Sequence, residues 1–254
     1  MVKKILPTAL AIAFFWLLWW AAAALSDSLI FPTPWQTLRA FLDIVFSARN
    51  WEHIGITFYR VVMGTVLGSS FGALLGIATR YSELVRTAVR TVIYPLLQSV
   101  PTICWALVFV LWFGLSDVTP ILAVAVAVAP FFVINIWEGM KELDNNLIEM
   151  ASMYTGQRAR ILRKVILPML YPYLFAAIKS STMVAWKVVI LGEVFGAASG
   201  MGYMLTIAFE SYRITQVFGW TLAFALILLL TDYGFFNYID RKYIRKWKPA
   251  EQKS

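Results

Sequence analysis

The sequence predicts an all-α membrane protein with six transmembrane helices, arranged as a single domain over residues 1–254. Of these residues 60% are hydrophobic and only 14% are charged, and the mean hydropathy is +0.71. A soluble domain of this length needs more polar surface. A transmembrane helix needs about 20 mostly apolar residues. Six stretches fit, at roughly residues 5–25, 57–79, 96–114, 119–138, 169–192 and 215–237.

The basic residues are distributed unevenly around these spans. If the N-terminus is cytoplasmic, inner segments carry 16 of the 22 Lys and Arg residues, and Arg60 lies at the outer mouth of the second span. The inner residues are Lys3, Lys4, Arg80, Arg86, Arg90, Lys141, Arg158, Arg160, Arg163, Lys164, Arg241, Lys242, Arg245, Lys246, Lys248 and Lys253. Because cytoplasmic loops are rich in Lys and Arg, we expect a multi-pass protein of the cytoplasmic (inner) membrane with both termini inside. Anionic lipid accounts for the net charge of +8, so no nucleic-acid partner is inferred.

The first span resembles a secretory signal, because Lys3 and Lys4 precede an apolar run that ends at Ala21–Ala24. Its apolar core is about 20 residues long, however, whereas the core of a signal peptide has 7–15. Removing it would also place the basic C-terminal tail on the wrong side of the membrane. We therefore expect a retained helix.

The second span carries Gly64, Gly68, Gly72 and Gly76 at four-residue spacing. These glycines share one helical face, where another backbone can approach closely, as is common for helices that associate in lipid. The strip predicts a helix-packing surface. The strip either packs against another helix of the same bundle or forms a contact that moves or that joins two copies in a dimer.

In the third span, Pro101 removes a backbone hydrogen bond, and Gln98, Ser99 and Thr102 can satisfy the freed groups. This break either faces a solute pathway or is a packing kink. The fifth span carries Lys187, and Glu193 follows near its outer end. Charged groups are costly in a bilayer and often functional. Lys187 either meets an anionic solute, pairs with a carboxylate such as Glu193 or Glu210, or extends to the interface.

A polar segment, residues 139–168, separates the fourth and fifth spans. Asp144 or Asn145 can cap a helix whose apolar residues recur at helical spacing, and Thr155–Gly156 supplies a turn in which Gly156 is free to take a positive φ. The apolar residues are Leu147, Met150, Ala151 and Tyr154. A short basic helix follows, and Pro168 opens the next span. We expect two short amphipathic helices on the cytoplasmic side; a hairpin held only by lipid headgroups is the alternative.

This segment resembles the EAA loop of ABC-importer permeases, whose pattern is Glu-Ala-Ala, three residues, Gly, nine residues, Ile, one residue, Leu-Pro. Glu149, Ala151 and Leu167–Pro168 fit, and Val165 replaces the Ile. The sequence departs at Met150 and at Thr155, where the Gly comes one residue late as Gly156. Two further segments, Glu193–Met204 and Gln98–Leu115, resemble the subfamily that handles sulfonates, nitrate, bicarbonate and related solutes.

The resemblance implies the type I importer permease fold and a function in ATP-driven import by alternating access. It implies a second permease copy (or a related permease), two ABC ATPase subunits that bind ATP and Mg, and an extracytoplasmic solute-binding protein. Residues assigned to ATPase coupling are Glu149, Ala151, Thr155, Gly156, Arg160, Leu167 and Pro168. Residues assigned to the pathway or gate are Gln98, Ser99, Pro101, Thr102, Lys187, Glu193 and Tyr203. Lys187 favours an anionic solute, and a thiamine-precursor-like solute is the alternative.

Other functional classes lack their sequence features. A stand-alone secondary transporter often shows inverted repeats and buried ion-coupling carboxylates, and neither is evident. An enzyme is disfavoured because no nucleophile, base and metal constellation occurs, and His53 has no neighbouring Cys or clustered acids, so no metal site is expected. The phosphate-binding pattern Gly-x-x-x-x-Gly-Lys is absent. We therefore expect no nucleotide site and no cofactor on this chain, and the resemblance assigns ATP and Mg to the partner ATPase.

Overall fold

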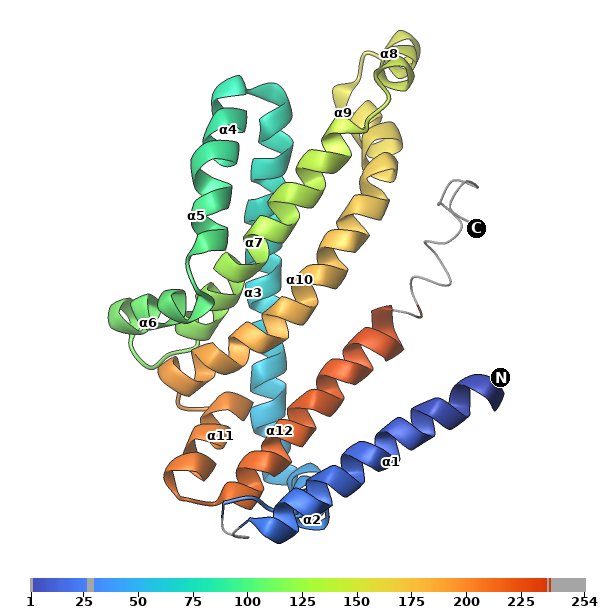
Figure 1. Ribbon diagram of the computed structural model, residues 1–254. Coiled ribbons are helices and arrows are strands. Elements are labelled where there is room, and N and C mark those ends of the chain that lie inside the picture. Colours follow the sequence, from blue (N-terminus) through green and yellow to red (C-terminus); the bar gives the residue numbers. More distant parts are fainter. Residues whose placement is uncertain (1, 27–29, 237, 239–254) are drawn as a thin grey trace. The chain divides into compact units, whose positions relative to one another are not determined.

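The structure is a computed structural model that describes residues 2–26, 30–236 and 238 (Figure 1). Within these residues every regular element is a helix. The chain divides into two compact units, one formed by residues 1–56 with 199–227 and the other by 57–198 with 228–254. The predicted basic tail, from Arg241 onward, lies outside the described residues, as do the side chains of Lys3 and Lys4.

The first unit contains α1, α2, the start of α3, α11 and most of α12. Their bounds are Val2–Leu25, Pro34–Phe46, Ala48–Tyr81, Met201–Glu210 and Ile214–Leu229. Helix α2 begins with a capping box, in which the Thr33 hydroxyl accepts from the Gln36 backbone N–H and the Gln36 side chain accepts from the Thr33 N–H. The helices α2 and α11 lie outside the six predicted spans.

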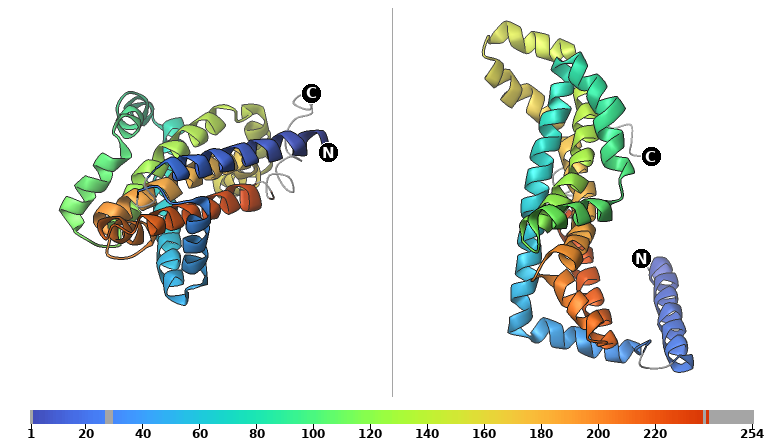
Figure 2. Two further views of the ribbon diagram at one scale, coloured as in Figure 1. Left: turned by 60° about the horizontal axis from the view of Figure 1, so that its bottom comes forward. Right: turned by 90° about the vertical axis from the view of Figure 1, so that its left-hand side faces the viewer.

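The second unit contains the rest of α3 and the helices that carry the polar segment. Its helices are α4 (Glu83–Ala88), α5 (Tyr94–Ser99), α6 (Thr102–Phe113), α7 (Val118–Lys141), α8 (Asn145–Tyr154), α9 (Arg158–Ile161) and α10 (Leu167–Gly196). Single π-helical turns at Val89–Ile93 and Leu162–Ile166 connect α4 to α5 and α9 to α10, and another, Leu230–Phe236, continues α12. Helix α7 is the most buried apolar helix of the described chain. It packs along α10 (Figures 1 and 2).

The described residues contain four helices long and apolar enough to cross a membrane: Ala48–Tyr81, Val118–Lys141, Ala159–Gly196 and Ile214–Gly234. They overlap the second, fourth, fifth and sixth predicted spans and are mostly longer. A bent pair, Glu83–Ser99 with Thr102–Phe113, would make a fifth. For the first span, α1 is helical from Val2 to Leu25, and its described apolar part is the shorter Ala13–Leu25.

The third span is not the straight helix predicted over 96–114. The α5 and α6 helices meet at 85°. Pro101 causes the break, since a residue before proline is driven out of the helical conformation, and Val100 is extended with φ −78° and ψ 121°. The Gln98 side chain donates to the Tyr94 hydroxyl at 3.3 Å rather than to freed backbone groups.

The glycine strip of α3 packs against α7 in the same chain. A Cβ added at Gly64 would lie 2.6 Å from the Val124 side chain, and one at Gly68 would overlap the Ala125 carbonyl oxygen. Gly72 and Gly76 likewise meet α7. All four glycines are buried by this contact, so the face that they share is occupied within the bundle.

Candidate functional site

In the polar segment α8 is a short helix, and a turn joins it to α9 (Figures 1 and 2). The expected second short helix is not separate, because α9 runs on through the π-helical turn into α10, and Pro168 lies inside the resulting helix Ala159–Gly196. Asp144 caps α8, because its Oδ1 accepts from the Asn146 N–H at 2.8 Å. Thr155 ends α8 in an extended conformation, and its hydroxyl accepts from the Gln157 N–H at 3.3 Å. We refer to residues 139–168 as the coupling loop, after the role predicted for them.

A hydrophobic cluster anchors the coupling loop to the bundle. Its buried members come from α7, the loop and the start of α10: Ile136, Met140, Leu143, Ile161, Ile166 and Leu170. Ile148 and Ala151 of α8 pack against this cluster. Ala151, the EAA-pattern residue, therefore lies on the face of α8 that is turned toward the bundle. Such packing resists bending, because buried side chains have few alternative arrangements.

The opposite face of α8 is exposed and largely apolar. Met153 and Tyr154 are 84% and 86% exposed, and Leu147 and Met150 are also exposed. Glu149 lies exposed beside them. An apolar surface on a short projecting helix is typical of a protein-interaction site. The sequence placed Leu147, Met150, Ala151 and Tyr154 on one side of the helix; in the structure Ala151 packs against the cluster, whereas the other three are exposed together with Met153.

The turn after α8 differs from the expected one. Positive-φ glycines in the described chain are Gly114 and Gly200, so Gly156 does not take the left-handed conformation predicted for it. A Cβ added at Gly156 would meet nothing within 4 Å. The extended Thr155 and its side-chain bond make the turn instead. Arg160 is exposed on α9, and Leu167 and Pro168 begin α10.

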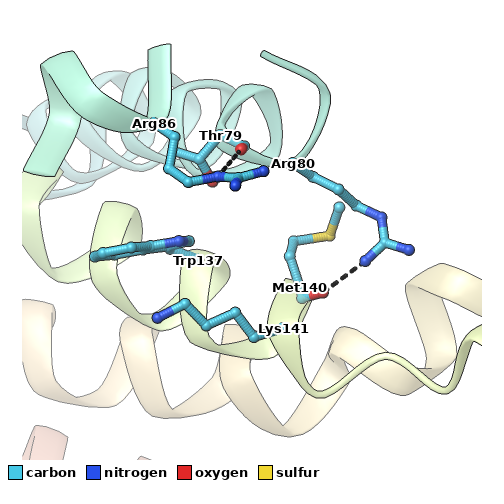
Figure 3. A pocket seen from close by; sticks show the side chains of 6 residues that line it. All are labelled: Thr79, Arg80, Arg86, Trp137, Met140 and Lys141. Carbon is cyan, nitrogen blue, oxygen red and sulfur yellow. Dashed lines mark hydrogen bonds between the residues drawn. The ribbon is translucent and has the colours of Figure 1, made fainter. Parts of the chain in front are cut away.

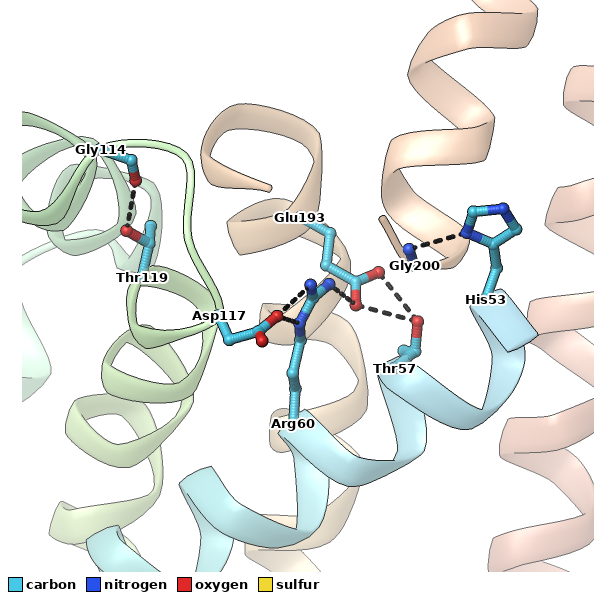
Figure 4. Close-up of polar contacts among 8 residues, drawn as sticks. All are labelled: His53, Thr57, Arg60, Gly114, Asp117, Thr119, Glu193 and Gly200. Carbon is cyan, nitrogen blue, oxygen red and sulfur yellow. Dashed lines mark hydrogen bonds and ion pairs between the residues drawn. The ribbon is translucent and has the colours of Figure 1, made fainter. Parts of the chain in front are cut away.

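A buried polar network joins α3 to α10 and to the start of α7 (Figure 4). Arg60 Nη1 donates to Glu193 Oε1 at 2.8 Å, and the Thr57 hydroxyl lies 2.9 and 3.0 Å from the two oxygens of that carboxylate. Arg60 Nε donates to Asp117 Oδ1 at 3.0 Å. Arg60 is 1% and Glu193 0% exposed, whereas the Asp117 side chain is 61% exposed. The network neutralises charges that would otherwise be costly to bury.

This network changes the interpretation of two sequence predictions. Glu193 was assigned to the pathway, but its carboxylate has no exposed surface and is held by Arg60 and Thr57. Arg60 was placed at the mouth of the second span, and it is buried. The sequence signal that could have identified it is an arginine one helical turn after Thr57, inside an otherwise apolar stretch.

Close packing and hydrogen bonds to backbone carbonyls hold the helix ends next to this network together. Gly196 leaves no room for a side chain, since an added Cβ would overlap Thr119 of α7. The Ser116 N–H donates to the Gly196 carbonyl at 3.0 Å, and the Thr119 hydroxyl donates to the Gly114 carbonyl at 2.9 Å. The ends of α6 and α10 and the start of α7 are thereby tied together around the ion pair.

The remaining predicted pathway residues occupy different surroundings. Lys187 is exposed on α10 although its neighbour Trp186 is fully buried, and Glu193 pairs with Arg60 rather than with Lys187. Ser99 ends α5, and Thr102 begins α6 at the bend. In the first unit, Tyr203 lies with its ring 6.4 Å from that of His53, whose Nδ1 accepts from the Gly200 N–H at 3.2 Å. Among the described residues, no group of three or more His, Cys, Asp or Glu could hold a metal ion.

Comparison with known proteins identifies the family. Residues 64–245 match the family described as "Binding-protein-dependent transport system inner membrane component". A Bacillus subtilis protein named as an aliphatic sulfonates transport permease, SsuC, is 30% identical, covering 86% of this chain and 78% of its own length. The taurine transport system permease protein TauC of Escherichia coli is 27% identical, covering 85% and 81%.

Solved structures show the same fold. A chain of the MetNI methionine ABC transporter in an inward-facing conformation aligns with a TM-score of 0.59 at 20% identity, covering 85% of this chain and 97% of that one. A chain of an amino acid ABC transporter crystallised with histidines aligns at 0.57 and 16% identity, covering 77% and 92%. The chain belongs to the family of binding-protein-dependent transport system inner membrane components, and it is an ABC-importer permease rather than an enzyme.

Proposed function

We propose that this chain is the membrane subunit of an ATP-driven importer for a small organic or inorganic anion, such as a sulfonate. The observation that carries the proposal is the coupling loop: a short helix anchored to the bundle on one face and exposed on the other. The relatives named for sulfonate and taurine transport support the solute class.

In this proposal the exposed face of α8 docks on an ABC ATPase. Tyr154 and Met153 supply apolar contact area, and Glu149 supplies a charge at its edge. Closure of two ATPase subunits around ATP and Mg would draw the two coupling loops of a permease pair together. Because Ile148 and Ala151 are packed against the cluster at the ends of α7 and α10, the movement passes to these long helices rather than being absorbed by the loop.

The pathway lies between two permease copies, which a homodimer supplies most simply. Lys187 is exposed on a single copy, within a long apolar helix that continues to Gly196. A charged side chain there is costly against lipid, which favours a position facing the second copy and an anionic solute. Lys187 is therefore the proposed solute contact, whereas the buried Glu193 holds helices together.

The proposed topology has six spans, with α1 and the bent α5–α6 segment completing the set, and both termini in the cytoplasm. This orientation puts the coupling loop and Arg80, Arg86 and Arg90 inside, as the positive-inside rule favours. The outer face would then receive solute from an extracytoplasmic binding protein. Alternating access needs only that ATP binding favours one of two arrangements of the spans.

The experiment that tests this proposal is purification of the tagged chain from its native membrane in mild detergent, with mass spectrometry of the proteins retained. Recovery of an ABC ATPase at near one-to-one stoichiometry supports the importer. A chain recovered alone, which moves solute in liposomes without ATP, would instead be a stand-alone secondary transporter.

A further inference from the structure

A cavity of about 240 Å³ lies in the second unit, where α7 leads into the coupling loop. Its lining comes from three helices (Figure 3): Thr79 and Arg80 end α3, Arg86 belongs to α4, and Trp137, Met140 and Lys141 end α7. The coupling, pathway and packing roles described above use none of the three basic side chains. All three basic side chains nevertheless line this one cavity.

Each of the three basic side chains has a contact that positions it, although Arg86 and Lys141 are partly open to solvent. Arg80 Nη1 donates to the Met140 carbonyl at 2.8 Å, which ties α3 to α7. Arg86 Nε donates to the Thr79 carbonyl at 3.0 Å. The Lys141 Nζ lies 3.9 Å from the centre of the Trp137 ring, a cation–π contact. Such pre-ordering lowers the entropy lost when a ligand binds.

The charge of the cavity is strongly positive. None of its six lining residues is acidic. The carboxylate of Glu83 contacts Arg86 at 2.7 Å from outside the lining, and both side chains are well exposed. Glu138 and Glu142 follow Trp137 and Lys141 in sequence, are exposed and do not line the cavity. Three cations therefore face one paired carboxylate, and a concave surface of one sign attracts a counter-ion.

We propose that this cavity binds the phosphate group of an anionic phospholipid headgroup. Phosphate oxygens accept charge-assisted hydrogen bonds from Arg and Lys, and basic pockets between helices on the cytoplasmic side suit anionic headgroups. Trp137 fits the same place, because tryptophan concentrates at the membrane interface. The cavity volume of about 240 Å³ is smaller than the roughly 300–1,000 Å³ of pockets that bind drug-sized ligands. The lipid source rests on the proposed orientation, which puts the cavity at the inner leaflet.

A phosphate bound here would brace the base of the coupling loop. It would bridge the ends of α3, α4 and α7 through Arg80, Arg86 and Lys141. Met140, whose carbonyl accepts from Arg80, is also a member of the hydrophobic cluster under α8. The bound headgroup therefore stiffens the segment through which the loop transmits movement.

The test is lipid retention by the full-length chain in nanodiscs of phosphatidylcholine with 20 mol% phosphatidylglycerol, read by native mass spectrometry. One retained phosphatidylglycerol per chain is expected, with at least five-fold lower retention in R86Q/K141Q. The single variant K141Q serves if the double variant folds poorly, because it removes neither the Arg80 nor the Arg86 contact with backbone carbonyls. K141Q should lower phosphatidylglycerol retention two-fold or more. R90Q is the matched control, because Arg90 is exposed on the next turn and does not line the cavity.

A second arm adds inorganic phosphate to pure phosphatidylcholine nanodiscs and measures the melting temperature. A K141Q-sensitive rise without phosphatidylglycerol retention would support the phosphate site but assign it to a soluble source. Equal retention by R90Q and R86Q/K141Q would overturn the proposal. The proposal would also be overturned if K141Q lowered ATPase recovery but changed neither lipid retention nor the melting temperature, because that result would assign the cavity to a protein partner. Neither nanodisc readout needs ATPase or transport, so a failure of the importer proposal would be seen separately.

Discussion

Arg60 and Glu193 form an ion pair 2.8 Å long that is buried between α3 and α10. The residues are 133 positions apart in the sequence. The Thr57 hydroxyl also donates to the Glu193 carboxylate, and the Arg60 guanidinium also donates to Asp117. This arrangement satisfies two charges within an otherwise apolar bundle, and it fixes how α3 and α10 meet.

Replacing Arg60 alone should strongly destabilise the protein. R60M leaves the Glu193 carboxylate buried without its cation, a change that costs about 3–5 kcal/mol in comparable buried pairs. The double variant R60M/E193L removes both charges and should recover most of the stability. Thermal unfolding in detergent measures both. A double variant no more stable than R60M would show that Arg60 acts mainly through Asp117.

Two glycine substitutions in α3 should differ in their effect on stability. G68A places a Cβ against the Ala125 carbonyl, where the backbone cannot yield, and should lower folded yield and melting temperature. G55A meets nothing within 4 Å and should be neutral or stabilising, because alanine is favoured over glycine in a helix by about 1 kcal/mol. Both are measured by detergent-solubilised yield and thermal unfolding. Equal effects would argue against the close contact of α3 with α7.

Changes on the exposed face of α8 should uncouple the permease without unfolding it. E149R reverses an exposed charge, and Y154A removes the most exposed large side chain of α8. Each should reduce ATPase recovery at least ten-fold while membrane insertion is kept. G156A is the control, since its Cβ has open space and its conformation is not left-handed. Normal ATPase recovery with both E149R and Y154A would remove α8 from the docking surface.

Replacing Lys187 should affect transport rather than folding. K187M keeps a side chain of similar length and removes the charge proposed to meet an anionic solute. Uptake of a sulfonate by proteoliposomes containing the assembled importer should fall at least ten-fold, with an unchanged melting temperature. K179M, about two helical turns earlier in α10, is the matched control. Unchanged uptake with K187M would leave Lys187 as a structural or interfacial residue.

The sequence predicted only part of the structure of the coupling loop. The short helix α8 and the turn after it follow from local signals, an Asp144 cap and helical spacing. The expected start of a new helix at Pro168 was wrong, because the helix is already continuous from Ala159 to Gly196. Which face of α8 is buried depends on the distant cluster around Met140 and Leu170. Periodicity reports that residues share a face, not which neighbour covers it. Spacing therefore placed Ala151 beside Leu147, Met150 and Tyr154 without showing that, of these four, only Ala151 packs against the cluster.

The amino-acid sequence alone determined the membrane character, most of the span positions, the glycine strip and the family resemblance, because composition, periodicity and motif spacing are local properties. Only the tertiary structure decided that α7 covers the glycine strip, that Pro101 turns the third span by 85°, and that Arg60 lies buried against Glu193. These features depend on contacts between residues far apart along the chain. An isolated charge in an apolar stretch has the same local pattern whether it faces solvent, solute or a buried partner, and only packing distinguishes these cases.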